Sequence, residues 1–342
     1  MNEMMAREIA AQAELLPTIQ PELARRADAL ARPKGRVFAG GCGDSLFAPK
    51  ALSEVFRLLR QPVATRSAMD MAAFTDFRPG DTVVLSSISG GTRRTVEAAG
   101  VAAAAGARVI ALTCTAGSAL AEAAHATIVL PFTPLSRKTP HTLDYAVTLL
   151  ALAEIARSFA GEAASGTRPA VAAVPGLLDR ARMDAADAAG AYDPAGKIVI
   201  LGAGPDLGTA EYGAAKFHEA GGLVAIAAET ENFIHGMNFM LEPCDLLIAL
   251  GGSMAGRRRG GEITEALAPL VKRALSYAPD LAAGSDLNPW QTALAMVWAQ
   301  TFFLQALCLR LADRLGLKLE EPRAGRAEGE SHLAAQARAM AR

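Results

Sequence analysis

Short runs of Val, Ile and Leu alternate with Ala-rich helical stretches along this chain, and that alternation constrains its fold more than any other feature. Such a pattern is typical of βαβ units and predicts an α/β fold with a mostly parallel sheet. In the first half it predicts a leading helix to about residue 31, a helix over about 46–59, and a five-strand sheet. The expected strands are 36–39, 63–66, 82–85, 109–112 and 127–130.

The second half begins in the same way as the first. A strand over 197–201 runs into a Gly-rich turn, and a strand over 245–250 runs into Gly251 and Gly252. Asp81 precedes Ser89 by eight residues, and Asp245 precedes Ser253 by the same interval. This repetition predicts an internal duplication of one α/β unit.

The chain has 342 residues, which at roughly 150 residues per domain agrees with two domains. A stretch rich in Gly, Ala, Ser and Pro marks the expected linker. The expected organisation is a first domain over 1–160 with its leading helix, a linker over 161–175, a second domain over 176–322 and a C-terminal tail over 323–342.

Composition excludes several classes of protein. The net charge is -1, from 34 basic and 35 acidic residues, which argues against nucleic acid or an anionic membrane as partner. The four cysteines lie far apart with no CxxC pair, so we expect no zinc site, no disulfide framework and a cytoplasmic location. No signal peptide is visible at the N-terminus. The apolar stretch 294–312 is interrupted by polar residues, which favours a helix buried in a core or a dimer interface over a membrane span.

Two polar loops, 40–45 and 86–92, follow strands of the first half, where doubly wound sheets bind their ligands. Free N–H groups at a helix N-terminus, together with hydroxyl donors, suit a phosphate dianion. The alternative is that Ser89 or Thr92 only caps its helix. The residues expected to bind phosphate or sugar in these loops are Gly43, Asp44, Ser45, Ser87, Ser89, Gly90 and Thr92.

A dinucleotide site is a competing interpretation of the first loop, because Gly41-Cys42-Gly43 follows a strand. The third glycine of that fingerprint is missing, since position 46 is Leu, and no acidic residue stands about 20 positions later. A nucleotide-dependent oxidoreductase therefore remains only a distant alternative. No P-loop and no cluster of metal ligands is visible, so we expect no cofactor and no metal.

The order of strand, GCGDS, strand and SxSGxT, duplicated, resembles the sugar isomerase (SIS) family, and most closely its double-SIS proteins. These include the isomerase half of glucosamine-6-phosphate synthase, aminosugar-phosphate deaminases and fructosamine-6-phosphate deglycases. The resemblance runs from residues 5–12, similar to the family's leading "M-x-x-E-I-x-x-Q" helix, to Glu321-Pro322-Arg323, similar to its "D-x-P-R". It implies two tandem SIS domains, each a parallel five-strand, flavodoxin-like sheet flanked by helices, and a homodimer with shared active sites.

The same resemblance implies catalytic residues in the second half. In the family, a glutamate moves a proton between C1 and C2, a lysine three residues before it assists, and a histidine sixteen residues after it helps to open the sugar ring. Glu219, Lys216 and His235 have these spacings, and the segment around His235 is expected to reach a neighbouring subunit's site. Glu211, on the same predicted helix, and Thr142 are expected to contact substrate. The alternatives are a surface ion pair of Lys216 with Glu219 and an ordinary loop histidine at His235.

Departures from the family pattern leave the reaction open. Asp44 replaces a threonine of the synthases and disfavours a nearby dianion, so we expect it to hold a sugar hydroxyl or amine instead. The family's "VASTK" segment is replaced by 136–142, from which Arg137, Lys138 and Thr142 are expected to reach a sugar or phosphate.

The expected function is that of a phosphosugar isomerase-type enzyme acting on the 6-phosphate of an amino-substituted sugar. The reaction would be aldose–ketose isomerisation or deamination through a cis-enediol or enolamine intermediate. The alternatives are a fructosamine-6-phosphate-type deglycase and a non-catalytic sugar-phosphate-binding regulatory protein.

Overall fold

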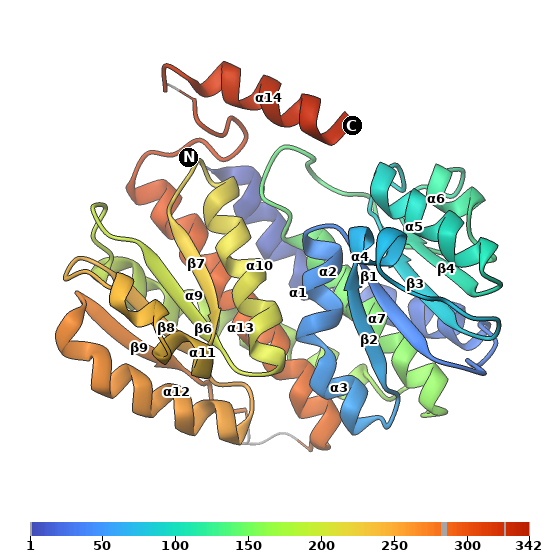
Figure 1. The fold of residues 1–342 in the computed structure, drawn as a ribbon. Helices are drawn as coiled ribbons and strands as arrows, with labels where there is room; N and C mark the ends of the chain where they lie inside the picture. Colours follow the sequence, from blue (N-terminus) through green and yellow to red (C-terminus); the bar gives the residue numbers. More distant parts are fainter. Residues whose placement is uncertain (1, 282–285, 325, 342) are drawn as a thin grey trace.

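The computed structural model describes residues 2–281, 286–324 and 326–341, which form two α/β units side by side (Figure 1). The first unit holds a parallel sheet in the order β2-β1-β3-β4-β5. Its strands are β1 (Val37–Gly41), β2 (Val63–Ser67), β3 (Thr82–Ser86), β4 (Arg108–Thr113) and β5 (Ala126–Val129). All five expected strands are thus confirmed, and their order is the flavodoxin-like one.

The second unit holds a parallel sheet of four strands in the order β7-β6-β8-β9. Its strands are β6 (Ile198–Gly202), β7 (Ala225–Glu229), β8 (Leu246–Leu250) and β9 (Arg273–Tyr277). The expectation of five strands in this sheet was therefore wrong. After β9 the chain reaches its next helix through 278–288, a segment with Pro279 and no run of β-branched residues, and the described part of that segment forms no strand.

Helices cover both sheets and pack together between them. In the first unit they are α1 (Glu3–Asp28), α2 (Asp44–Ala51), α3 (Ser53–Leu58), α4 (Ala68–Ala73), α5 (Arg93–Ala104), α6 (Ala119–Glu122) and α7 (Leu143–Ala160). The chain continues through α8 (Arg168–Ala172), α9 (Val174–Ala191), α10 (Pro205–Glu219), α11 (Thr230–Ile234), α12 (Met254–Leu267), α13 (Pro289–Arg314) and α14 (Gly329–Ala341). Two 3₁₀ helices are η1 (Met237–Met240) and η2 (Ala268–Leu270). The single helix expected over 46–59 is divided at Leu52 into α2 and α3, and the range 161–175 contains α8 and the start of α9.

The two units share a glycine turn and an aspartate hydrogen-bonding pattern at equivalent positions, which confirms the internal duplication. Gly43 precedes α2 with φ 55° and ψ −124°, and Gly204 precedes α10 with φ 58° and ψ −119°. Residues that carry a side chain rarely adopt this positive φ, so glycine is favoured at both turns. Asp81 and Asp245 each accept a hydrogen bond from the backbone N–H three residues earlier and pair with the basic residue before the first strand of the same sheet.

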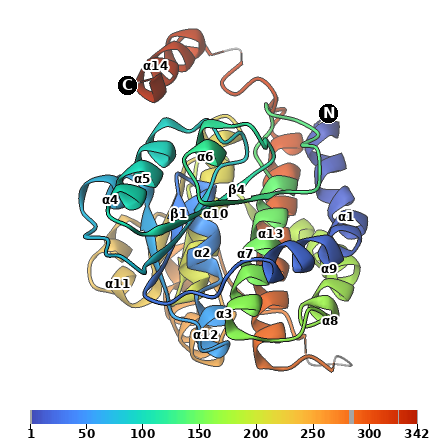
Figure 2. The same ribbon diagram turned by 90° about the vertical axis from the view of Figure 1, so that its right-hand side faces the viewer.

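Helix α13 lies in the interior, between the two units. It packs against α9 and α10, and Figure 2 shows α1, α7, α9 and α13 gathered on one side of the molecule. Trp298, Phe302 and Phe303 on this helix are fully buried. Among the described helices α13 alone is long and apolar enough to cross a membrane, but most of that stretch is buried in the chain. The prediction of a buried helix is confirmed, and because α13 is covered by its own chain, it leaves no apolar face for a dimer interface.

Candidate active site

The candidate site lies where α2 of the first unit packs against α10 of the second. The start of α2 meets the end of α10 at Asp44 and Lys216, and the end of α2 meets the start of α10 at Ala51 and Gly208, so the two helices run in opposite directions. Asp44 pairs with Lys216 at one end of this contact, and Lys50 pairs with Glu211 at the other. The first pair therefore lies at the carboxyl edge of the first sheet, which is the edge where such sheets bind ligands.

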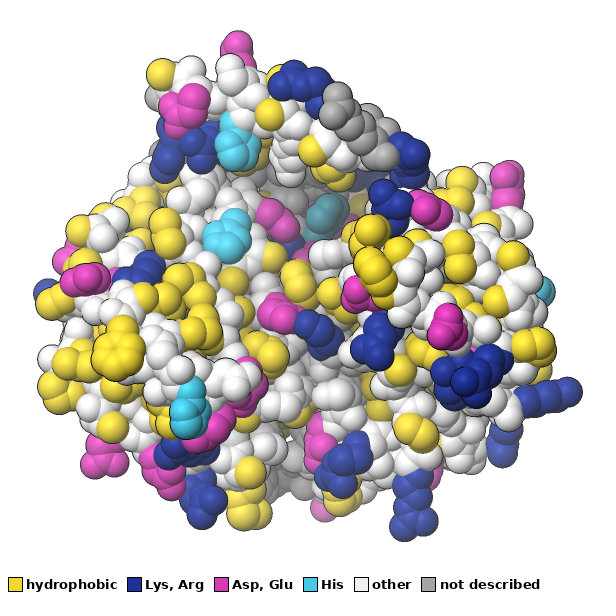
Figure 3. Space-filling view, viewed as in Figure 1, with side chains coloured by type: hydrophobic (Ala, Val, Ile, Leu, Met, Phe, Trp, Pro, Cys, Tyr) yellow, Lys and Arg dark blue, Asp and Glu magenta, His cyan; other side chains and the backbone are white. Residues whose placement is uncertain are grey.

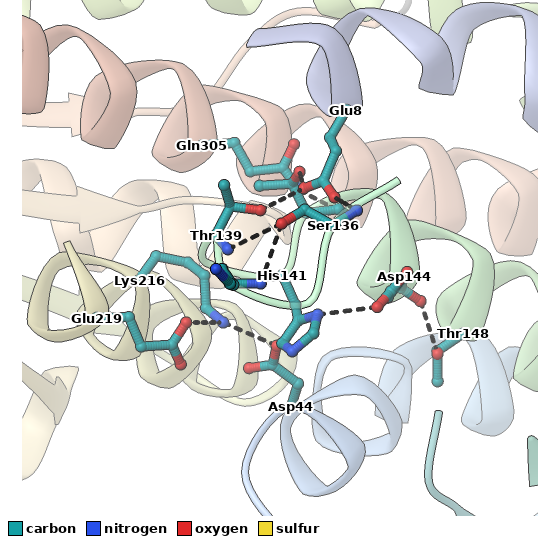
Figure 4. Close-up of polar contacts among 12 residues, drawn as sticks. Glu8, Asp44, Ser136, Thr139, His141, Asp144, Thr148, Lys216, Glu219 and Gln305 are labelled. Carbon is teal, nitrogen blue, oxygen red and sulfur yellow. Dashed lines mark hydrogen bonds and ion pairs between the residues drawn. The ribbon is translucent and has the colours of Figure 1, made fainter. Parts of the chain in front are cut away.

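The side chain of Lys216 is the centre of a charged cluster. Its Nζ donates to Asp44 Oδ2 at 2.8 Å and to Glu219 Oε2 at 2.7 Å (Figure 4). Lys216 is fully buried, whereas the Asp44 and Glu219 side chains are 23% and 42% exposed. Burial raises the pKa of Asp44. Burial alone would lower the pKa of Lys216, but the two carboxylates outweigh it and raise that pKa. Lys216 is therefore a buried ammonium group, which the interpretation as a surface ion pair does not describe.

A buried carboxylate, Glu8, binds the loop 136–142, which lies beside this cluster. Glu8 of α1 accepts from Ser136 N at 3.1 Å, from Thr139 Oγ1 at 3.2 Å and from Thr142 Oγ1 at 3.0 Å. Burial raises the pKa of Glu8. Thr142 is itself fully buried, so the structure directs its hydroxyl toward Glu8 and not into the Lys216 cluster.

The same loop carries His141, to which the sequence had assigned no role. Its Nδ1 lies 2.8 Å from Asp144 Oδ2, and its backbone oxygen accepts from the hydroxyl of Tyr212 at 3.0 Å. The hydrogen bond to Asp144 raises the pKa of His141. The signal available in the sequence was the His-x-x-Asp spacing at the start of a helix, inside a segment already seen to depart from the family pattern.

A cleft of about 680 Å³ opens beside the cluster and is lined by Glu219, His141, Arg137 and Lys138. Helix α14 forms its opposite wall, and Figure 3 shows the hollow beneath that helix. Arg137 and Lys138 are exposed and form no ion pair with another described residue. Within 2–281, 286–324 and 326–341, no group of three or more His, Cys, Asp or Glu side chains is placed to hold a metal ion.

The second polar loop, 86–92, makes hydrogen bonds among its own hydroxyls and backbone amides just before α5. Ser87 Oγ lies 2.9 Å from Thr92 Oγ1 and accepts from Gly90 N at 3.1 Å, while Ser89 Oγ accepts from Gly91 N at 3.2 Å. Thr92 is the N-cap residue, but its side chain makes no capping hydrogen bond. The N-terminus of α5 is therefore not closed by Thr92, and Ser89 is exposed beside it.

The glycines of the two loops are required by close approach. A Cβ at Gly41 would lie 2.5 Å from Cβ of Ser45, and one at Gly90, where φ is 67°, would lie 2.0 Å from Oγ of Ser118. Because β1 and β3 are neighbours, these contacts place Gly43 and Ser45 at the same sheet edge as the 86–92 loop.

Two predicted site residues lie outside this group. Both carboxylate oxygens of Glu211 accept from Lys50 Nζ, at 2.7 and 2.8 Å. His235 is 74% exposed, and its Nε2 lies 3.8 Å from Glu231. Since α10 runs from the carboxyl edge to the amino edge of the second sheet, Glu219 lies at the amino edge, whereas His235 follows β7 and α11 at the carboxyl edge. No contact joins His235 to Glu219 in the described part of the chain.

In the second unit, a buried carboxylate occupies the turn that corresponds to the loop 40–45 of the first unit. Asp206 occupies the position that Ser45 has in the first unit, and it is almost fully buried. Its Oδ2 accepts from Gly252 N at 2.9 Å and its Oδ1 from Gln300 Nε2 at 2.9 Å. A Cβ at Gly256, in the first turn of α12, would lie 2.9 Å from Asp206 Oδ2. Burial raises the pKa of Asp206 to about 6.

Comparison with known proteins places this geometry among related folds. The SIS domain family matches residues 29–154 and 192–272. No curated protein sequence matches the chain. At 20% identity and a TM-score of 0.76, the structure is similar to glucosamine-6-phosphate deaminase from Thermotoga maritima, covering 94% of this chain and 98% of that one.

Two further solved structures have the same architecture. Tagatose-6-phosphate ketose/aldose isomerase from Escherichia coli matches at 17% identity and a TM-score of 0.71, covering 93% of this chain and 95% of that one. The C-terminal domain of glucosamine-fructose-6-phosphate aminotransferase from Francisella tularensis matches at 16% identity and a TM-score of 0.72, covering 93% and 98%. At these identities the likeness concerns the fold.

Proposed function

The chain belongs to the SIS domain family, and from that premise we propose that it is a phosphosugar isomerase-type enzyme. The proposed substrate is the 6-phosphate of an amino-substituted sugar, and the reaction is isomerisation or deamination through an enediol or enolamine. The observation that carries the proposal is Glu219, a partly exposed carboxylate that lines the cleft and is held by the buried ammonium of Lys216.

Glu219 is suited to be the base because enolisation needs a carboxylate positioned at the carbon that loses its proton. In this mechanism Glu219 takes the C2 proton of an open-chain aldose and returns it to C1, while water carries the hydroxyl proton from O2 to O1. The positive charge of Lys216 stabilises the negative charge that develops on the sugar oxygen in between. Lys216 is fixed by Asp44 as well as by Glu219, so it needs little rearrangement when substrate binds.

The direct test is product analysis after incubation with a panel of 6-phosphates of glucosamine, galactosamine, fructose and glucose and of fructosyl-amino acids. Wild-type protein should convert at least one of them and should exchange with deuterated solvent the C2 hydrogen of an aldose substrate or a C1 hydrogen of a ketose substrate. Binding without conversion or exchange across the panel would instead support the sugar-phosphate-binding regulatory protein.

A fructosamine-6-phosphate-type deglycase is a second candidate, and one observation favours it. Arg137 and Lys138 line the cleft without an ion-pair partner among the described residues, and they suit a substrate whose amine carries a carboxylate. Deglycation shares the enolisation step, so Glu219 keeps the same role. Release of a free amino acid from the fructosyl-amino acid 6-phosphates of the panel would select this candidate.

We expect Ser89→Ala to lower the affinity for a sugar 6-phosphate by about one to two orders of magnitude. The exposed hydroxyl of Ser89 stands at the start of α5, where it is proposed to donate a charge-assisted hydrogen bond worth roughly 1.5–3 kcal/mol. Calorimetric titration measures the change. Ser276→Ala, at an exposed serine of β9, is the control and should bind like wild type. Equal affinity of Ser89→Ala and wild type would show that this loop does not bind the phosphate.

We also propose a homodimer, in which His235 contributes to the site of the neighbouring copy. Within its own chain His235 lies at the carboxyl edge of the second sheet, opposite the edge where Glu219 lies. It is flanked by Met237 and Phe239, which are 41% and 88% exposed. Sedimentation equilibrium at micromolar concentration should give twice the 35.5 kDa of the chain. Phe239→Arg should dissociate the dimer, whereas Phe74→Arg, at another exposed phenylalanine, should not. A wild-type monomer under these conditions contradicts the proposal.

A further inference from the structure

We propose that His141, oriented by Asp144, is the acid that opens the sugar ring in its own chain's site. The inference rests on the proposed function, because ring opening matters only to an enzyme that acts on the open-chain sugar. It differs from the role that the family resemblance gives to His235, since His141 needs no second copy of the chain.

The histidine is fixed at both its backbone and its ring. Glu8 holds the loop, Tyr212 holds the backbone oxygen of His141, and Asp144 accepts from Nδ1. Asp144 is only 3% exposed, and its Oδ1 has no hydrogen-bond partner among the described residues, so the carboxylate serves the imidazole ring. A carboxylate at Nδ1 keeps the proton on that nitrogen and leaves Nε2 to face a ligand.

The free side of the ring is directed into the site. Figure 4 shows it turned toward Asp44, which is bound to Lys216, and His141 lines the same cleft as Glu219. The side chain of His141 is 40% exposed, so a bound sugar can reach Nε2. A base and a histidine are thereby present in one cleft of one chain.

The charges around the ring favour its protonated form. Asp144 of α7 makes the largest contribution, and Asp44 of α2 also raises the pKa of His141, while Lys216 of α10 opposes them. Glu8 of α1 and Glu219 of α10 are the other carboxylates facing this region, and Arg137 and Lys138 stand on the loop itself. Because the pKa is raised, more of the imidazole carries a proton near neutral pH, which is what an acid requires.

The proposed step is balanced in protons. Nε2–H gives its proton to the ring oxygen O5 as the bond between O5 and the anomeric carbon breaks. The anomeric hydroxyl becomes the carbonyl and releases its proton to water, from which Nε2 is protonated again. The product is the open-chain sugar, from which Glu219 then takes its proton.

The test compares two ketose phosphates in deuterated water. Fructose 6-phosphate exists mainly as a ring, whereas 5-deoxyfructose 6-phosphate has no O5 and stays open. His141→Asn should slow exchange of the C1 hydrogen of fructose 6-phosphate by on the order of 10² and leave exchange of the 5-deoxy compound within a few-fold of wild type. His141→Gln repeats the measurement should the first variant fold poorly, and His125→Asn, whose ring bonds a backbone amide of β4, is the control.

Asp144→Asn tests the positioning role through the pH profile. Since Asp144 raises the pKa of His141, its loss should move the basic limb of kcat/KM for fructose 6-phosphate to lower pH, which a purely structural defect would not do.

Three outcomes overturn the proposal. One is equal slowing of both compounds by His141→Asn, and another is selective slowing of the closed ring by His235→Ala and not by His141→Asn. The third is failure of wild type to convert or exchange any sugar phosphate of the panel, which would overturn the proposed function and this proposal with it.

Discussion

Glu219→Gln is expected to lower the turnover of a sugar 6-phosphate by on the order of 10²–10⁴ and to leave its binding nearly unchanged. Glutamine keeps the shape of the side chain, and its amide oxygen can still accept from Lys216 Nζ. It cannot accept the substrate's proton at neutral pH, so the enolisation step alone is affected. The measurements are kcat and KM on the substrate found in the panel, together with exchange in deuterated solvent of the C2 hydrogen of an aldose or a C1 hydrogen of a ketose.

The matched control is Glu262→Gln. Glu262 stands on α12 and accepts from Arg259, three residues before it, as Glu219 accepts from Lys216, but this pair is exposed and outside the cleft. Its loss should leave turnover unchanged. Equal activity of Glu219→Gln and wild type would move the chain from the enzymes to the sugar-phosphate sensors, because a sensor needs the hydroxyl loops and no base.

Arg157→Met is expected to reduce the free energy of unfolding by about 3–5 kcal/mol, which is the usual cost of leaving a buried charge without its partner. Arg157 and Glu154 are both fully buried on α7 and are joined by a hydrogen bond of 2.6 Å. Arg157 also donates to Asp28 at the end of α1, at 2.6 Å. Methionine keeps much of the length of the side chain but leaves Glu154, among the described residues, with only the neutral donors Gln20 and Thr167.

Urea denaturation at neutral pH measures this change against Arg180→Met. Arg180 bonds both oxygens of Asp184 on α9, at 2.8 and 2.9 Å, but its side chain is 62% exposed. Exposed pairs contribute about 0–1 kcal/mol, so the control should change little. Similar losses in the two variants would show that burial of the Arg157 pair does not set its contribution.

The sequence predicted the elements whose information is local. The five strands of the first sheet are short apolar runs bounded by turn residues, and each is where the pattern placed it. The fifth strand expected in the second sheet rested on the family resemblance and not on an apolar run of its own, and the described residues form only four strands there. The break at Leu52 was missed because both sides of it have helical character.

Only part of the candidate site could be predicted from the sequence. The Lys216–Glu219 spacing is local, since residues three apart share a helix face. The contacts that complete the cluster join residues far apart, such as Asp44 with Lys216 across 172 positions and Glu8 with Thr139 across 131. Such pairs depend on how helices pack, which no pattern within one segment encodes. The roles proposed for Glu219, Lys216 and His235 stay predictions.

The carboxylate of Asp206 has a consequence for stoichiometry. Of the two related Gly-rich turns, one carries the small hydroxyl of Ser45, and the other already carries an anionic group of its own, bonded to Gly252 N in the loop after β8. A phosphate approaching the second turn would meet a fixed carboxylate in the place it needs. A chain built from two copies of one binding unit should therefore saturate with one equivalent of sugar phosphate.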